Sequence, residues 1–295
     1  MRSPTDFPVK AADGRVLRVR VSGNPEGRPV FFLHGTPGSR LGPTPRSKIL
    51  YNLGVRLISF DRPGYGGSER LEARRVRDAA DDVVAIARHL DIGKFAALGR
   101  SGGGPHALAC AALLPEQVTR VGVLVSLAPW EDMGSQWFNG MTPSNVREYK
   151  ATAEPGVLAA RLGQAAAKIK ADPSSHVATL GPEMPADDRR VVADAGIRAR
   201  LAENFAEALR DSAAGWIDDA LAFRRPWGFD LADIKAPVLL WHGADDVFSP
   251  VNHTQWLANK IASAEVVIQP GRAHFSALEE IPEVLSWLVK SDPLG

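Results

Sequence analysis

A single serine stands in a cluster of glycines in the stretch KFAALGRSGGGPHALACAALL, residues 94–114. Residues 99–103 read Gly-Arg-Ser-Gly-Gly and match the pattern G-x-S-x-G, with an apolar run before the pattern and an alanine-rich run after it. A serine in this pattern sits at a sharp turn between a strand and a helix, where small neighbours let the chains pass closely. The turn raises the hydroxyl above the sheet, and the N–H groups at the start of the helix point toward a developing oxyanion. The sequence therefore predicts that Ser101 is a nucleophile.

A serine nucleophile needs a base that takes its proton and an acid that orients the base. In a parallel α/β sheet the expected chain order is serine, acid, histidine, each on a loop that follows a strand. Asp245 and Asp246 directly follow the apolar run PVLLWHG, and His274 follows the next such run, AEVVIQPG. Because these loops leave the same edge of the sheet as Ser101, we predict a catalytic group of Ser101, His274 and one of the two aspartates.

Two other interpretations compete for the serine stretch. One is an ordinary glycine-rich loop with an incidental serine, since G-x-S-x-G alone is a weak signal. The other is a dinucleotide site, because residues 102–107 fit G-x-G-x-x-A. That site needs an acid at the end of the next strand, and the segment VSLAPW at that point has none. The remaining histidines favour structural roles in strand ends, helices or connectors: His34, His89, His106, His176, His242 and His253.

The elements that position these groups alternate along the chain. Runs typical of strands occupy residues 15–21, 29–35, 55–61, 95–99, 121–127, 237–243 and 264–271. Helical patterns occupy residues 72–90, 105–114, 251–262 and 277–290. Strands that alternate with helices indicate βαβ units, so the predicted fold class is α/β with a mostly parallel central sheet flanked by helices.

The strand signal disappears in residues 130–228, which show helical patterns such as 156–171 and 186–223. The strands after this region still need the same sheet to bury them. We therefore expect one α/β core domain, formed by residues 1–129 and 229–295, with a helical insertion at 130–228.

The insertion leaves and re-enters the chain beside the predicted catalytic edge, and its helices carry apolar faces that need cover. These features favour a lid over the site. Trp137 and Phe138, near the start of the insertion, are candidates for lining an apolar substrate pocket. The alternative for these aromatic side chains is packing inside the lid itself.

The composition excludes several function classes. The chain has 295 residues, of which 45% are hydrophobic and 23% charged, with a formal net charge of +1. The near-neutral balance argues against nucleic acid as a partner, and no segment approaches 18 uninterrupted apolar residues, which argues against a membrane. A single cysteine, Cys110, forms neither an intramolecular disulfide nor a cysteine metal cluster. The N-terminus lacks a signal-peptide core, so we expect a cytoplasmic protein that acts on a small-molecule substrate.

Together the ordered motifs resemble the α/β-hydrolase family, in its serine hydrolase branch. Besides the serine motif, HGTPGS (34–39) resembles the His-Gly loop that follows the third strand of the family. FDRPGYGGS (60–68) resembles the family's Asp-Arg-x-Gly-x-Gly-x-Ser segment, and GADDVFSP (243–250) resembles its G-x-x-D-x-x-x-P pattern. The resemblance covers nearly the whole chain except the insertion, and it implies the α/β-hydrolase fold with a helical lid insertion.

The resemblance also assigns roles to particular residues. It implies a triad of Ser101, His274 and Asp246, since the G-x-x-D-x-x-x-P pattern selects the second of the two adjacent aspartates. It further implies an oxyanion hole formed by the backbone N–H groups of Thr36 and Gly102. Relatives that dehalogenate alkanes or open epoxides use an aspartate nucleophile, so the serine excludes those branches.

The chemistry implied by the resemblance is acyl transfer through an acyl-enzyme, with no metal and no organic cofactor. A carboxylic ester of a small, apolar substrate is the favoured bond. Lactonase, C–C bond hydrolase, amidase or aminopeptidase, and perhydrolase activities with the same triad stay open, as does a non-catalytic ligand-sensing relative. Arg100 stands where many relatives carry an uncharged residue, and we expect it to pair with an acid under the serine turn, with substrate binding as the alternative.

Overall fold

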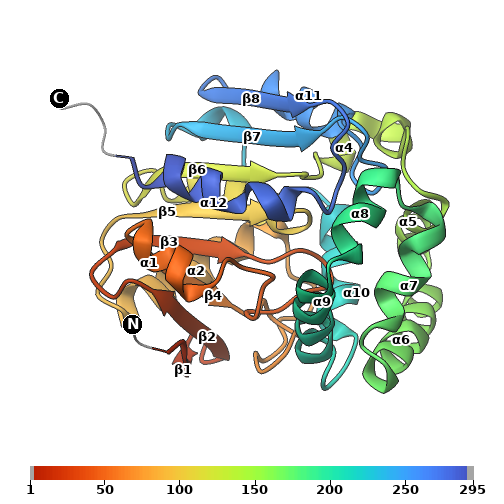
Figure 1. Cartoon of the computed structure of the whole chain (residues 1–295), viewed down its shortest axis with the longest axis horizontal. Helices are drawn as coiled ribbons and strands as arrows, with labels where there is room; N and C mark the ends of the chain where they lie inside the picture. The colour runs from red at the N-terminus through yellow and green to blue at the C-terminus, as the bar shows by residue number, and fades with distance from the viewer. Residues whose placement is uncertain (1–2, 291–295) are drawn as a thin grey trace.

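The computed structural model describes residues 3–290 and contains an eight-stranded sheet with the order β1-β2-β4-β3-β5-β6-β7-β8. The strands are β1 (Thr5–Lys10), β2 (Val16–Gly23), β3 (Arg28–Leu33), β4 (Val55–Phe60), β5 (Phe95–Arg100), β6 (Val118–Leu124), β7 (Val238–Gly243) and β8 (Ala264–Gln269). β2 pairs antiparallel with both β1 and β4, whereas the pairs from β4 through β3 to β8 are parallel. Because parallel strands end at one edge, the loops after β3, β5, β7 and β8 meet there (Figure 1).

Helices cover both faces of the sheet, as the alternating pattern predicts. The helices of the core are α1 (Ser47–Asn52), α2 (Ala79–His89), α3 (Gly103–Leu113), α11 (Asn252–Ala258) and α12 (Ala277–Leu288). Successive side chains of a strand point to opposite faces. Ala96 and Leu98 of β5 therefore pack with α1 and α12, whereas Phe95 and Ala97 pack with α2, α3 and α11. The prediction of a mostly parallel sheet flanked by helices is confirmed.

The insertion between β6 and β7 is helical throughout and stands beside the edge where the parallel strands end (Figure 1). Its α-helices are α4 (Trp130–Met133), α5 (Pro143–Lys150), α6 (Pro155–Ala171), α7 (Ser175–Leu180), α8 (Ala186–Ala193), α9 (Ala195–Ala208) and α10 (Ala214–Phe223). Residues 186–223, expected as one helical stretch, form three helices. Asp194 adopts an extended conformation, and its side chain accepts a hydrogen bond from the Ile197 N–H at 2.8 Å, so it ends one helix and caps the next.

Strand β1 has no counterpart in the sequence-based prediction. It forms the open edge of the sheet beside β2, and of its side chains only Val9 is buried. Pro8 lies within it and cannot donate to a ladder, which an edge strand tolerates. A mostly exposed strand that contains proline lacks the apolar alternation by which strands are predicted, which explains the omission.

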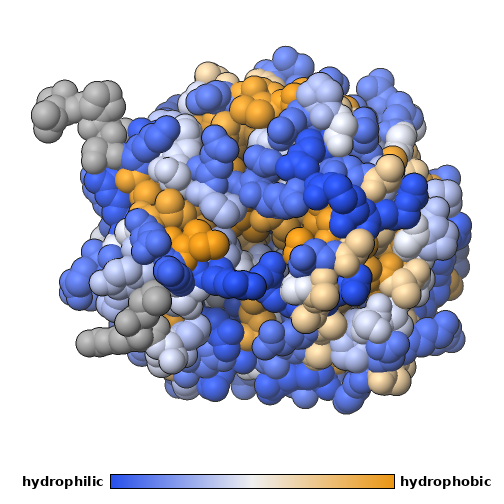
Figure 2. All heavy atoms as spheres, viewed as in Figure 1, coloured by the Kyte–Doolittle hydropathy of each residue, from blue (hydrophilic) through white to orange (hydrophobic). Residues whose placement is uncertain are grey.

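The face of the molecule in Figure 2 is mostly hydrophilic, with apolar side chains gathered in small patches. One of these patches lies over β8, where Val266, Val267 and Ile268 are exposed at the other edge of the sheet. Among the helices of residues 3–290, none combines the length and the apolar composition that a bilayer crossing requires.

Candidate active site

Ser101 occupies the turn between β5 and α3 with a φ of +54°, a left-handed conformation that is strained for a residue with a side chain. The glycines around it permit close approaches. A β-carbon on Gly103 would lie 1.9 Å from the carbonyl oxygen of Leu33, and one on Gly102 would lie 2.3 Å from the Thr36 hydroxyl. The glycine cluster therefore brings the serine turn against the loop that follows β3.

His274 and Asp246 form a buried hydrogen-bonded pair. The Nδ1 atom of His274 lies 2.8 Å from Oδ2 of Asp246, and because a carboxylate only accepts, Nδ1 carries the hydrogen. The other oxygen of Asp246 accepts the backbone N–H groups of Phe248 and Ser249 at 2.8 and 3.0 Å. Asp245, by contrast, is exposed. The geometry therefore joins His274 to the second of the two adjacent aspartates and leaves its Nε2 free to act on Ser101.

A second histidine supports the same carboxylate. His242 is fully buried, with Nε2 2.6 Å from the Ser249 carbonyl oxygen and 3.3 Å from Oδ2 of Asp246, and with Nδ1 2.7 Å from the Thr254 hydroxyl. Since a carbonyl only accepts, Nε2 carries the hydrogen and also faces the carboxylate. Burial alone would raise the pKa of Asp246, but His274 and His242 outweigh it and the pKa lies below its ordinary value. The acid of the pair is thus ionised at neutral pH.

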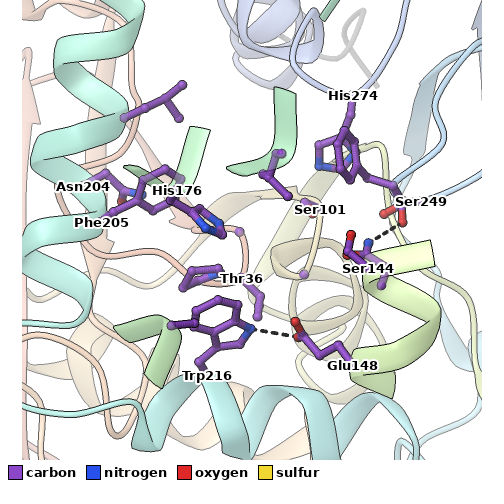
Figure 3. Close-up of a pocket in the computed structure, with 18 of the residues that line it drawn as sticks. Thr36, Ser101, Ser144, Glu148, His176, Asn204, Phe205, Trp216, Ser249 and His274 are labelled. Atoms are coloured by element: carbon purple, nitrogen blue, oxygen red, sulfur yellow. Dashed lines mark hydrogen bonds between the residues drawn. The ribbon is translucent and has the colours of Figure 1, made fainter. Parts of the chain in front are cut away.

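Thr36 and Gly102, the two residues expected to form an oxyanion hole, lie beside Ser101. Both line the same pocket as Ser101 and His274, and Figure 3 shows Thr36 on the side of Ser101 away from His274. Neither N–H donates a hydrogen bond to any acceptor within residues 3–290. Unpaired donors beside a serine hydroxyl are the arrangement that stabilises an oxyanion.

Asp219 of α10, in the insertion, reaches into the core beneath this loop. Its Oδ2 accepts hydrogen bonds from the Thr36 hydroxyl at 2.6 Å and the Tyr65 hydroxyl at 2.8 Å. The guanidinium groups of Arg62 and Arg74 lie 2.5 and 2.7 Å from its oxygens. Burial alone would raise the pKa of Asp219, because it disfavours the charged carboxylate. The positive charges of Arg62 and Arg74 outweigh this effect and hold the pKa well below its ordinary value. A carboxylate of the insertion therefore fixes the Thr36 side chain.

Replacing Asp219 with asparagine should lower the free energy of unfolding by about 3–5 kcal/mol, because Arg62 and Arg74 would stay buried without a counter-charge. The wild-type contribution should be complete above about pH 4, the ordinary pKa range of aspartate, and should be lost as the pH falls toward the depressed folded pKa. Urea unfolding at pH 7 and at acidic pH measures both effects.

The neighbouring aspartate provides a matched control. Asp218 pairs with Arg70, whose side chain is 41% exposed and stays hydrated when the partner is lost. Asp218→Asn should therefore cost only about 1 kcal/mol. Equal losses in the two variants would show that the Asp219 network does not carry the stability assigned to it.

The pocket above Ser101 has a volume of about 290 Å³ and lies between the core and the insertion. Besides the core loops it is lined by side chains of the insertion, which are Ser144, Asn145, Glu148, Tyr149, Leu158, Arg161, Leu162, Ala165, His176, Thr179, Leu180, Leu201, Asn204, Phe205 and Trp216. Many of these are apolar, and they face Ser101 from α5, α6, α7, α9 and α10.

The structure leaves Trp137 and Phe138 out of this lining. Trp137 is fully buried, and its indole N–H donates to the carbonyl oxygen of Ala128 at 2.7 Å. Phe138 packs against Trp137 at 5.4 Å between ring centroids and lies 5.1 Å from the Arg224 guanidinium. Both rings serve as packing, Phe138 within the insertion and Trp137 also against Ala128 and His253 of the core, rather than as lining of the pocket.

The predicted acid partner of Arg100 is also missing. The guanidinium of Arg100 donates to the backbone carbonyl of His274 at 3.1 Å and forms no ion pair with any carboxylate of residues 3–290. The two acids that influence it electrostatically, Asp188 and Asp246, lie beyond ion-pair distance.

Some site residues escaped the sequence analysis. Glu148 lines the pocket and accepts the indole N–H of Trp216 at 2.8 Å, and burial raises its pKa to about 7 (Figure 3). A usable signal existed for Asp219, because AGWIDDALAF (214–223) places two adjacent acids in an otherwise apolar helix. Acidic side chains on the apolar face of a helix are buried only when they have charged or hydrogen-bonding partners. The partners of Asp219, Arg62 and Arg74, lie far away in the sequence.

A mostly parallel eight-stranded sheet, a strained serine between β5 and α3, and a His–Asp pair on the loops after β8 and β7 together define an α/β hydrolase. The model of the alpha/beta hydrolase fold family matches residues 28–281. The chain therefore belongs to the α/β-hydrolase family.

Individual relatives differ in what they do. The chain is 27% identical over 286 residues to the dihydrolipoyllysine-residue acetyltransferase component of the acetoin cleaving system of Pseudomonas putida, a match that covers 94% of this chain and 67% of that protein. It is 38% identical over 101 residues to a proline iminopeptidase of Neisseria gonorrhoeae, which is 33% of this chain and 32% of that one. An esterase structure from Exiguobacterium antarcticum superimposes with a TM-score of 0.70 at 23% identity, over 97% of this chain and all of the other. That likeness shows the shared fold.

Proposed function

We propose that this protein is a serine hydrolase that cleaves a carboxylic ester of a small substrate through an acyl-enzyme on Ser101. The observation that carries the proposal is the arrangement around one pocket. That pocket is lined by a strained serine, by a histidine held by the ionised Asp246, and by Thr36 and Gly102, whose backbone N–H groups donate to no acceptor within residues 3–290.

The first half of the reaction forms the acyl-enzyme. Nε2 of His274 accepts the proton of the Ser101 hydroxyl as its oxygen attacks the ester carbonyl, and the N–H groups of Thr36 and Gly102 stabilise the oxyanion. The Asp246 carboxylate stabilises the imidazolium that results. When the intermediate collapses, His274 returns the proton to the departing alcohol.

The second half releases the acid. His274 takes a proton from a water molecule that attacks the acyl carbonyl. When the second oxyanion intermediate collapses, the bond between the acyl carbon and the Ser101 oxygen breaks, His274 returns the proton to that oxygen, and the carboxylic acid product leaves. The insertion acts as a lid in this proposal. Side chains from five of its helices line the pocket, which supports a role in shutting water away from the bound substrate.

A panel of substrates tests the type of bond. It contains activated and alkyl esters, lactones, and aminoacyl amides, since the match to a proline iminopeptidase makes the amide bond the natural competitor. We expect the highest kcat/KM on esters. Turnover confined to amides or to lactones would replace the ester in this proposal, and no turnover on any class would favour a ligand-binding relative.

Filling the pocket should shorten the acyl chain that the protein accepts. Ala165 of α6 lines the pocket, so Ala165→Trp should lower kcat/KM for octanoate esters by about 10-fold relative to acetate esters. Trp137→Phe, which changes a buried ring outside the lining, should lower stability by about 2 kcal/mol but leave the acyl preference unchanged. Unchanged preference in Ala165→Trp would mean that the acyl chain binds elsewhere.

A further inference from the structure

Arg100 presents a buried guanidinium beside the serine. It is the last residue of β5, directly before Ser101, and only 6% of it is exposed. Its Nη2 donates to the His274 carbonyl oxygen at 3.1 Å, and its Nη1 lies 3.6 Å from the point where a β-carbon on Gly35 would stand. The guanidinium therefore lies between the histidine loop and the loop after β3, and Arg100 lines the pocket.

The charge of Arg100 has no carboxylate partner within residues 3–290, although its guanidinium carbon lies 5.5 Å from the centroid of the Phe275 ring. Its Nε and Nη1 donate to no acceptor there, and no carboxylate lies within ion-pair distance. Asp246 is occupied by its two histidines. Oδ1 of Asp188 accepts the Phe275 N–H at 2.6 Å, and its buried Oδ2 makes no hydrogen bond and lies beyond ion-pair distance of Arg100. Burial lowers the pKa of Arg100 only to about 10, so the group is cationic at neutral pH.

A buried charge that faces only an aromatic ring and a backbone carbonyl is costly for the fold, because neither of them neutralises it. A hydrogen bond to a backbone carbonyl does not require that charge, because a neutral amide side chain donates equally well. A carboxylate that enters the pocket would supply the missing partner and would use the nitrogens that donate to nothing now.

We propose that Arg100 binds a carboxylate of the substrate, so that the natural substrate is an ester whose acyl part carries a second, ionised carboxyl group near the scissile carbonyl. This inference rests on the proposed ester hydrolysis at Ser101. The other charged groups of the pocket are Arg161 of α6, which is exposed, and Glu148 of α5. In the close-up the Glu148–Trp216 pair and His274 lie on opposite sides of Ser101 (Figure 3). Arg100 contacts the backbone of His274, so it is separated from the Glu148 carboxyl group.

Esters that differ only in charge test this directly. Monomethyl succinate and monomethyl glutarate are compared with methyl 4-oxopentanoate and methyl 5-oxohexanoate, in which a methyl ketone replaces the carboxylate at the same length. We expect wild-type kcat/KM to favour the better carboxylate ester by about 10- to 100-fold, the strength of a hydrogen bond to a charged group. Titration of released acid measures all four reactions.

Two variants assign the preference to one cation. Arg100→Gln keeps a donor for the His274 carbonyl but loses the charge, so the carboxylate-to-ketone ratio should fall to about one. Arg161→Gln removes the other cation of the pocket and should keep the wild-type ratio. A wild-type ratio of one, a ratio that survives in Arg100→Gln, or equal losses on both esters would each overturn the proposal.

A second readout needs neither ester turnover nor a folded variant. Glutarate, but not 5-oxohexanamide, should protect wild-type Ser101 from covalent labelling by a fluorophosphonate. Protection without ester turnover would remove the proposed ester hydrolysis and leave anion binding standing. Ester turnover without protection and without charge preference would remove the role of Arg100 alone.

Discussion

Replacing Ser101 with alanine should lower kcat/KM on the best ester of the panel by about 10⁵-fold or more. The oxygen of the Ser101 hydroxyl attacks the ester carbonyl to form the acyl-enzyme. Without this oxygen, His274 has no nucleophile to activate for that step. Initial rates at enzyme concentrations high enough to detect the residual reaction measure the loss.

The fold should tolerate this change. Alanine has a β-carbon like serine, so the strain of the +54° φ stays the same, and the Ser101 hydroxyl makes no hydrogen bond within residues 3–290 that folding needs. Unfolding curves of the variant and the wild type should therefore agree within about 1 kcal/mol. A folded variant that keeps a tenth of the wild-type rate would show that another residue forms the covalent bond.

Asp246→Asn should reduce kcat by about 10⁴-fold while leaving substrate binding close to that of the wild type. An asparagine carries no charge to stabilise the imidazolium, and its amide can turn a donor toward Nδ1, which favours the wrong tautomer of His274. The second histidine beside the acid, His242, also loses its charged partner.

Asp245→Asn is the control for this prediction, because it makes the same change one residue away on an exposed side chain. It should alter kcat by less than about 3-fold, since an exposed charge acts weakly on its surroundings. A larger loss of kcat in Asp245→Asn than in Asp246→Asn would show that the His274–Asp246 hydrogen bond is not the one that supports catalysis.

The parts of the site that the sequence predicts are those fixed by chain topology. Ser101 lies between an apolar run typical of a strand and a helical run, so the pattern predicts its place at the end of that strand, which is β5 in the structure. Acids and a histidine directly after later strands must reach the same edge when the strands are parallel. Element ends thus predict which loops meet at the site, and the motif around residues 243–250 predicts which aspartate contacts the histidine.

The parts that the sequence misses depend on packing between distant segments. Asp219 binds Arg62 and Arg74, more than a hundred residues away, and no local pattern connects them. The sequence places the aromatic Trp137 near the site, yet its hydrogen bond to Ala128 and the neighbouring rings of Trp130 and His253 bury it where the insertion joins the core. For Arg100 the sequence predicts an acid partner, and only the three-dimensional arrangement reveals that no carboxylate reaches it.

The same contacts link the insertion to the reacting groups. Asp219 belongs to α10, and its hydrogen bond to the Thr36 hydroxyl fixes the loop that lines the pocket beside Ser101. The pocket wall opposite the serine comes from helices of the same insertion. In the proposed reaction, therefore, the insertion both limits access to Ser101 and supports the loop that carries Thr36.

Covalent labelling with a fluorophosphonate, followed by mass mapping of the modified peptide, tests the assignment of the nucleophile most directly. We predict a single adduct on Ser101, its absence in Ser101→Ala, and much slower labelling in His274→Ala, because the base that activates the hydroxyl is gone. An adduct on a different residue, or none on protein that hydrolyses esters, would contradict the assignment of Ser101 as the catalytic serine.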